Sequence, residues 1–221
     1  EIAKIRGIKK GEPGITPTRM KDVENTEDLK KMVDWIRDVY DGRPVGIKFA
    51  AGHIEEDIEQ ALKASPDFIT LDCRGGATGS SPIFLKDNVC VPPIYALRRA
   101  RRYLDSVNSK VTLCITGGFR DSSDIAKAVA LGADAVALGT ASMISIGCLQ
   151  SKVCHTGRCP VGIATQDEDL RRLFSVKNGV KGFVNFYNTT NHELKVFARS
   201  NGKNDIHQLN LSDIFTINDD I

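Results

Sequence analysis

The chain has 221 residues, of which 41% are hydrophobic and 26% charged, a composition that is ordinary for a soluble globular protein. It carries 30 basic and 28 acidic side chains, so its formal net charge is only +2. This balance gives no electrostatic reason to expect nucleic acid as a partner. No apolar run approaches the ~20 residues of a membrane span, and the first residues do not form a signal peptide. We therefore expect a cytoplasmic location and no membrane span. Because the first residue is Glu1, we expect a processed chain or a piece of a longer one.

The first 24 residues are rich in Lys, Gly and Pro, which is typical of a loop. Apolar residues at helical spacing over 26–40 predict a helix, with Thr26 as its N-cap. From residue 43 onward, strands and helices alternate. We expect strands at 43–50, 67–73, 111–118 and 134–140, and helices at 53–65, 91–107 and 122–133. After these come a helix from Ala141, a cysteine-containing loop, and helices at 167–174 and 180–200.

Apolar strands separated by amphipathic helices indicate parallel β/α units, because a parallel strand needs a crossover and is buried on both faces. Four strands suffice for a doubly wound sheet. A closed (β/α)8 barrel needs eight, and the residues before the first strand are too few to hold four more.

Two glycine-containing loops follow the last two predicted strands. Gly117 and Gly118 end one strand, and Gly139 and Thr140 end the next. Without a Cβ atom, a glycine lets backbone N–H groups approach a phosphate closely, and a helix begins behind each loop. In (β/α)8 enzymes a phosphate site is frequently built from the loops after the last two strands. The pair therefore predicts a phosphate site, although each loop alone is also typical of a tight strand-to-helix turn.

The strand at 43–50 contains a lysine, Lys48, within the apolar run VGIKF. A buried lysine is costly unless it meets an anion or an electron-rich ring. If this strand lines a barrel, Lys48 lies near its C-terminal end and projects toward a cofactor; otherwise it reaches solvent. A further glycine-rich loop, CRGGATGSSP at 73–82, follows the second strand and is typical either of a binding loop or of a flexible turn.

Three of the six cysteines cluster as C-x5-C-x4-C, with Pro160 after the last. Cys148, Cys154 and Cys159 favour an iron–sulfur cluster, because thiolates from a helix end and a loop can converge on one cluster. Zinc held by the three thiols and His155 is the main competitor, but its usual spacing has pairs two to four residues apart. We expect the remaining cysteines to be small buried hydrophobic residues: Cys73, Cys90 and Cys114.

Taken in order, four segments resemble the FMN-binding region of glutamate synthase and of its smaller archaeal and bacterial relatives. They are VGIKF, GGATGSSP, TGGFRDSSDIAKAVALGADAVALGTA and IGCLQSKVCHTGRCPVGIATQDEDLRRLF. The resemblance runs from about residue 15 to about residue 200. It implies a (β/α)8 TIM barrel of which this chain supplies the fifth to eighth strands, followed by a cysteine-rich loop and C-terminal helices. The implied divisions are half a barrel at 1–146, a cluster-binding segment at 147–166 and a helical extension at 167–221.

The resemblance also implies the cofactors and the site residues. FMN would be bound through its phosphate at Gly117, Gly118, Gly139 and Thr140, with further contacts from Lys48, Gly76, Thr78 and Gly79. Lys48 would be the catalytic residue near flavin and substrate. A 3Fe–4S cluster would be held by Cys148, Cys154 and Cys159. The glycine-rich loop at 73–82 differs from that of the larger enzymes of the family, because no acidic residue of the loop precedes its glycines.

The implied activity is reductive amination of 2-oxoglutarate to glutamate. The implied partners are the N-terminal half of the barrel on the same or another chain, a glutaminase that supplies ammonia from glutamine, and ferredoxin or an NAD(P)H-dependent reductase. One alternative is a glutamate-dependent amine-transfer enzyme of the same family. Another is a non-catalytic electron-transfer or assembly subunit that completes a partner's barrel. FMN barrels of the hydroxy-acid oxidase kind share the phosphate loops but do not account for the three cysteines.

Overall fold

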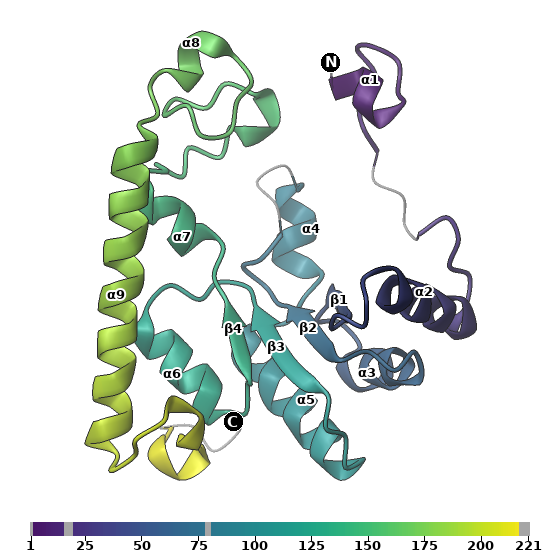
Figure 1. Ribbon diagram of the computed structural model, residues 1–221, viewed down its shortest axis with the longest axis vertical. Coiled ribbons are helices and arrows are strands. Elements are labelled where there is room, and N and C mark those ends of the chain that lie inside the picture. Colours follow the sequence, from purple (N-terminus) through teal and green to yellow (C-terminus); the bar gives the residue numbers. More distant parts are fainter. Residues whose placement is uncertain (1, 16–19, 78–80, 217–221) are drawn as a thin grey trace.

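Four parallel strands form the centre of the molecule. The computed structural model describes residues 2–15, 20–77 and 81–216. Its sheet consists of β1 (Gly46–Ala50), β2 (Phe68–Asp72), β3 (Thr112–Thr116) and β4 (Ala135–Ala137), in the order β1-β2-β3-β4. All pairings are parallel. The predicted parallel β/α units are thus confirmed, with β1 and β4 at the two edges of the sheet (Figure 1).

Each pair of neighbouring strands is joined through at least one helix. The connections are α3 (Ile54–Lys63), α4 (Ile83–Asn88) with α5 (Pro93–Ser106), and α6 (Ser122–Ala130). After β4 come α7 (Thr140–Ser145), the 3-10 turn η1 (Cys154–Thr156), α8 (Glu168–Arg171) and the 25-residue α9 (Val176–Ser200). Two further 3-10 turns, η2 (Ile206–Gln208) and η3 (Leu211–Asp213), follow. None of the helices in the described ranges is long and apolar enough to cross a membrane.

Some element boundaries differ from the predictions. The N-terminal segment, expected to be a loop, contains α1 (Ile2–Arg6). The next helix, α2 (Thr26–Val39), is capped by Asn25 and not by Thr26, because the Asn25 side chain accepts the backbone N–H of Asp28 at 2.9 Å. Helix α4 was not expected. Helix α9 begins four residues earlier than predicted, where the Ser175 side chain caps it.

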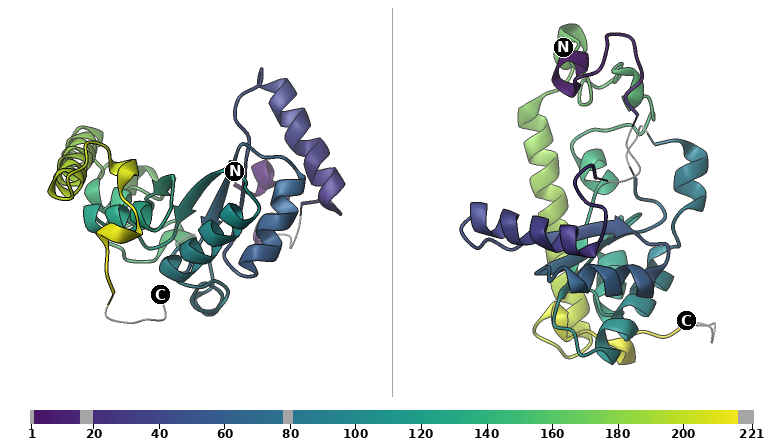
Figure 2. Two further views of the ribbon diagram at one scale, coloured as in Figure 1. Left: turned by 90° about the horizontal axis from the view of Figure 1, so that it is seen from below. Right: turned by 90° about the vertical axis from the view of Figure 1, so that its right-hand side faces the viewer.

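The core lies between one face of the sheet and helices α3, α5 and α6 (Figure 2). Alternate strand residues point to that face, and the central ones are completely buried: Ile69, Leu71, Leu113 and Ile115. They pack against fully buried residues of α3 and α5: Ile54, Ile58, Leu97 and Leu104. This alternation follows from the period of two along a strand.

The opposite face of the sheet, called here the inner face, carries side chains in three rows that follow the strand register. The rows are Gly46–Phe68–Thr112, Lys48–Thr70–Cys114–Ala135 and Ala50–Asp72–Thr116–Ala137. None of these residues is buried, so the described helices cover only one face of the sheet. Layers of inward side chains contributed by successive strands are a feature of the interior of a (β/α)8 barrel.

Two glycines inside α9 bring that helix close to α7. A Cβ atom on Gly182 would overlap the carbonyl oxygen of Ser145, and one on Gly179 would lie 2.8 Å from the Phe174 ring. Nearby, the hydroxyls of Ser142 and Tyr187 are 2.8 Å apart. A glycine inside a helix costs up to about 1 kcal/mol relative to alanine. Here the close packing of α7 explains the glycine at 182, and the Phe174 ring explains the glycine at 179. The packing of α7 on α9 also fixes the end of α7 from which the cysteine loop departs.

The Asp67 carboxylate joins α2 to the start of the sheet and provides a test of this packing. It accepts the backbone N–H of Val45 at 2.7 Å and the Arg37 guanidinium at 3.0 Å. These bonds, the Val45 one first, lower the pKa of Asp67 below its ordinary value of 3.8. A lowered carboxyl pKa contributes stability above the ordinary pKa, and this stability is lost as the pH falls through the folded-state value.

We therefore expect Asp67→Asn to reduce the free energy of unfolding by about 1 kcal/mol at neutral pH, since the carboxylate is partly exposed. The difference from the wild type should shrink below about pH 4, and chemical denaturation at several pH values measures it. Asp169→Asn is the control, because that carboxylate is exposed and pairs with Arg172, three residues further along the chain. An Asp67→Asn effect that is independent of pH would contradict the expectation.

Candidate functional site

The described residues of the predicted flavin site lie at or near the C-terminal ends of the strands, toward α4 and α7 in Figure 1. The glycine loops after β2 and β3 pack backbone against backbone. A Cβ atom on Gly75 would lie 3.2 Å from the Cα of Gly118, and one on Gly117 would lie 2.5 Å from the carbonyl oxygen of Cys73. Gly117 and Gly118 both have positive φ, 113° and 91°. Glycine is required at Gly117 for both reasons, since an L side chain would clash there and would strain the backbone.

The loop after β4 is open where the loop after β3 is crowded. Gly139 precedes α7 and has a φ of −104°. Apart from its two chain neighbours, no described residue has an atom within 4 Å of the position where its Cβ would lie. The backbone N–H groups of Gly117, Gly118, Gly139 and Thr140 make no hydrogen bond to the described residues. Unpaired backbone N–H groups beside an open space are suited to an anion with several oxygens, such as a phosphate.

Lys48 lies on the inner face and forms an ion pair that the sequence did not reveal. Its Nζ is 2.9 Å from Oδ2 of Asp72, the last residue of β2. The Lys48 side chain is 58% exposed and that of Asp72 is 23% exposed. The lysine is therefore neither buried in the core nor unpaired, and the carboxylate beside it supplies the acidic group that the glycine-rich loop itself lacks. The sequence signal that could have identified Asp72 is an aspartate at the end of the apolar strand FITLD.

The glycine-rich loop after β2 is only partly described. Thr78 and Gly79, both predicted to contact the cofactor, lie outside the described residues. Gly76 is described, and the space that its Cβ would fill is taken by the Asp72 carboxylate. The glycine thus makes room for Asp72, while its predicted contact with a cofactor stays a prediction.

The cysteine segment fits thiolate chemistry at one position. Cys159 is buried, and burial by itself raises the pKa of its thiol. The nearby backbone N–H groups of Ala164, Val161, Ile163 and Gly162 favour the thiolate and outweigh burial, so the pKa of Cys159 falls below the ordinary value. Cys148 accepts the backbone N–H of Gln150 at 3.4 Å, and Cys154 is exposed.

These three thiols are close in sequence but are not gathered around one point. In the described part of the chain, no three His, Cys, Asp or Glu side chains stand in an arrangement that could hold a metal ion. Cys159 matches the environment of a metal-binding thiolate, which is stabilised by N–H donors. Binding one cluster would require Cys148 and Cys154 to approach Cys159.

The other cysteines follow the prediction only in part. Cys73 is buried as expected, and burial raises the pKa of its thiol to about 12. Cys90 and Cys114 are only partly buried, although burial raises their pKa values as well. Cys114 differs from the expectation because it belongs to the inner face, where the described helices provide no cover.

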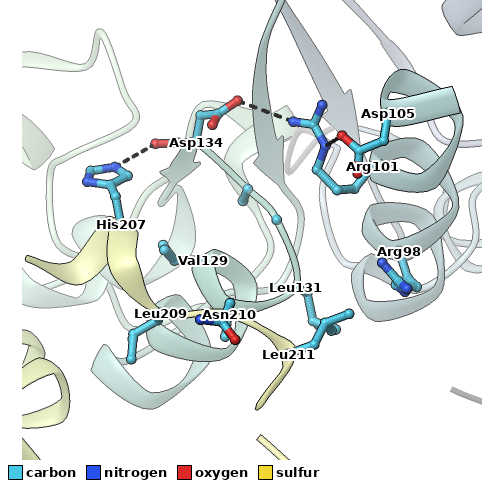
Figure 3. A pocket seen from close by; sticks show the side chains of 13 residues that line it. Arg98, Arg101, Asp105, Val129, Leu131, Asp134, His207, Leu209, Asn210 and Leu211 are labelled. Atoms are coloured by element: carbon cyan, nitrogen blue, oxygen red, sulfur yellow. Dashed lines mark hydrogen bonds and ion pairs between the residues drawn. The ribbon is translucent and has the colours of Figure 1, made fainter. Parts of the chain in front are cut away.

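A cavity of about 460 Å3 lies at the opposite end of the sheet, below the start of β4 (Figure 3). Its walls come from α5, from the segment between α6 and β4, and from the C-terminal turns. His207 reaches the carbonyl oxygen of Asp134 at 3.1 Å, and Arg101 is 2.9 Å from Asp105. None of the predicted site residues lines this cavity.

Among solved structures, the fold resembles that of a flavocytochrome b2 mutant, with a TM-score of 0.55 and 18% identity over 85% of this chain and 37% of that one. It also resembles a lactate oxidase of Pediococcus acidilactici, with a TM-score of 0.56 and 22% identity over 88% of this chain and 42% of that one. At such identities the likeness concerns the fold alone. Together with the uncovered inner face, it defines a protein of the parallel α/β class that is consistent with half of a (β/α)8 barrel.

Sequence comparison is more specific. A family model described as the conserved region in glutamate synthase matches residues 1–204, and the chain belongs to that family. It is 34% identical to the archaeal glutamate synthase (NADPH) of Archaeoglobus fulgidus over 94% of its length and to an archaeal-type one of Thermotoga maritima over the same share. It is 32% identical over 91% of its length to the ferredoxin-dependent glutamate synthase of Pyropia yezoensis. The chain spans 42% of the first two relatives and 13% of the third.

Proposed function

We propose that this chain is the C-terminal half of the FMN-binding barrel of a glutamate synthase, with the cluster-binding segment of that enzyme. The observation that carries the proposal is the meeting of the glycine loops with the Lys48–Asp72 pair at one end of the sheet. Membership of the glutamate synthase family supports it. The reaction would be reductive amination of 2-oxoglutarate to glutamate, in the cytoplasm, with ammonia that a glutaminase releases from glutamine.

The residues of this chain would act by binding and by electrostatics. Gly117, Gly118, Gly139 and Thr140 would donate backbone N–H groups to the FMN phosphate. Lys48 would stabilise negative charge on the reduced flavin or bind a carboxylate of the substrate. When bound, FMN supplies hydride to the imine that ammonia forms with 2-oxoglutarate. The four strands that complete the barrel would come from another part of the same polypeptide or from a partner.

Cys148, Cys154 and Cys159 would hold a 3Fe–4S cluster. The support is their spacing and the N–H donors around the Cys159 sulfur, which stabilise a thiolate. A cluster in this segment would relay electrons to the flavin from ferredoxin or from an NAD(P)H-dependent reductase. Ferredoxin and NADPH both occur in the names of relatives.

The test is the cofactor content of the protein with its complete barrel. We expect a yellow-brown protein that releases FMN on denaturation, contains iron and acid-labile sulfide in near-equal amounts, and forms glutamate from 2-oxoglutarate and ammonia or glutamine. A colourless protein would contradict the proposal and favour a scaffold that completes a partner's barrel. A coloured protein that only moves amino groups between glutamate and an amine would favour the amine-transfer alternative.

A further inference from the structure

Two charged residues stand together on the inner face, and among the described strand residues of that face they are the only charged side chains. They belong to neighbouring rows. The register pairs Lys48 with Thr70 and Ala50 with Asp72, so the lysine reaches diagonally, one row toward the glycine loops, to meet the carboxylate. Diagonal neighbours of a sheet lie within reach of a long side chain. The 2.9 Å contact with Asp72 therefore orients the Lys48 side chain, which is 58% exposed.

The carboxylate itself has little freedom to move. Its Oδ2 faces Lys48, and its Oδ1 fills the space beside Gly76 that any other residue would occupy with its Cβ. Only 23% of the Asp72 side chain is exposed. Asp72 is thus held by its position at the end of β2 and by the loop that follows, and it serves as the less exposed partner of Lys48.

From this geometry we propose that Asp72 is a positioning residue, which orients Lys48 beside the glycine loops and lowers the reduction potential of a flavin bound there. The inference rests on the proposed function. Reduced flavin carries more negative charge than oxidised flavin, so an uncompensated lysine favours the reduced form. An aspartate beside that lysine offsets part of the positive charge and fixes the position of the ammonium group. Asp72 would therefore make the reduced flavin a stronger hydride donor than Lys48 alone would allow.

The test compares the two-electron midpoint potentials of the FMN-loaded protein with its complete barrel. In Asp72→Asn, the ratio of FMN affinities, reduced over oxidised, should rise at least tenfold, which corresponds to about 30 mV in the positive direction. Lys48→Gln should move the potential in the negative direction. Asp72→Glu, which keeps the charge, should stay within a few-fold of the wild type. Asp105→Asn is the matched control, since Asp105 pairs with Arg101 at the same distance of 2.9 Å, beside the cavity at the other end of the sheet.

A double-mutant cycle separates positioning from a direct effect of the Asp72 charge. We expect the Asp72→Asn shift to fall to less than half in the Lys48→Gln background. A full shift in that background, no shift in the wild-type background, or a negative shift would each overturn the inference while leaving the proposed function intact. Wild-type protein without FMN would overturn both. If Asp72→Asn does not fold, Asp72→Ser takes its place in the same cycle.

Discussion

Replacing Gly139 by valine should remove FMN and leave the fold intact. The open space beside Gly139 is where the proposed phosphate would lie. Apart from its two chain neighbours, no atom of the described residues lies within 4 Å of the position of its Cβ. Its φ of −104° lies outside the left-handed region that favours glycine. A branched side chain would fill the space and keep phosphate oxygens away from the N–H groups of Gly139 and Thr140. We expect the dissociation constant of FMN to rise at least about 100-fold, which amounts to the loss of two charge-assisted hydrogen bonds.

The measurement is FMN titration by fluorescence quenching, with thermal unfolding of the flavin-free protein in parallel. Gly14→Val is the matched control, because Gly14 lies in the N-terminal segment and its φ is also outside the left-handed region. Beyond its chain neighbours, Ile8 is the one described residue near the position of its Cβ, at 3.8 Å. Gly117→Ala gives a useful contrast. It should destabilise the flavin-free protein, since its Cβ would clash with the Cys73 carbonyl at a φ of 113°. Full FMN binding by Gly139→Val would contradict a phosphate site at this loop.

The sequence predicted the parts of the site that depend on local pattern. Alternation of apolar strands and amphipathic helices was enough to find all four strands within a few residues, and α3, α5 and α6 between them, but not α4. Lys48 was identified as unusual because it interrupts an apolar strand. The glycine loops were found because glycines at the ends of two successive strands are a local signal.

Features that depend on contacts between distant residues were not predictable. The Lys48–Asp72 pair depends on the register of β1 against β2, which places residues 24 apart in the chain on adjacent rows. The continuous helix α9 contains Gly179 and Gly182, which lower helix propensity; the glycines are explained by the close approach of the Phe174 ring and of α7. Asn25 caps α2 in place of Thr26, and one-residue differences of this kind are not resolved by propensity, since both residue types cap well.

Replacing Cys159 by serine should abolish the proposed iron–sulfur cluster. Serine has nearly the same shape, but its hydroxyl is not a thiolate and is a poor ligand for iron in such clusters. Cys159 is the cysteine of the segment whose sulfur is surrounded by N–H donors, and these donors stabilise the charged form that a metal requires. We expect iron and acid-labile sulfide to fall to background in Cys159→Ser, with FMN retained because the glycine loops belong to the ends of β3 and β4.

Cys90→Ser is the matched control for this experiment. Cys90 is partly buried, and burial raises the pKa of its thiol, which opposes metal binding, so iron and sulfide should stay at the wild-type level. Iron and sulfide retained in Cys159→Ser would contradict the assignment of Cys159 as a ligand. Stoichiometric zinc without sulfide in the wild type would instead establish a site of three cysteines and His155. The two metals are separable by elemental analysis, because only the cluster carries inorganic sulfide. One sample therefore distinguishes the two interpretations of the C-x5-C-x4-C segment: iron with sulfide indicates a cluster, and zinc without sulfide indicates a zinc site.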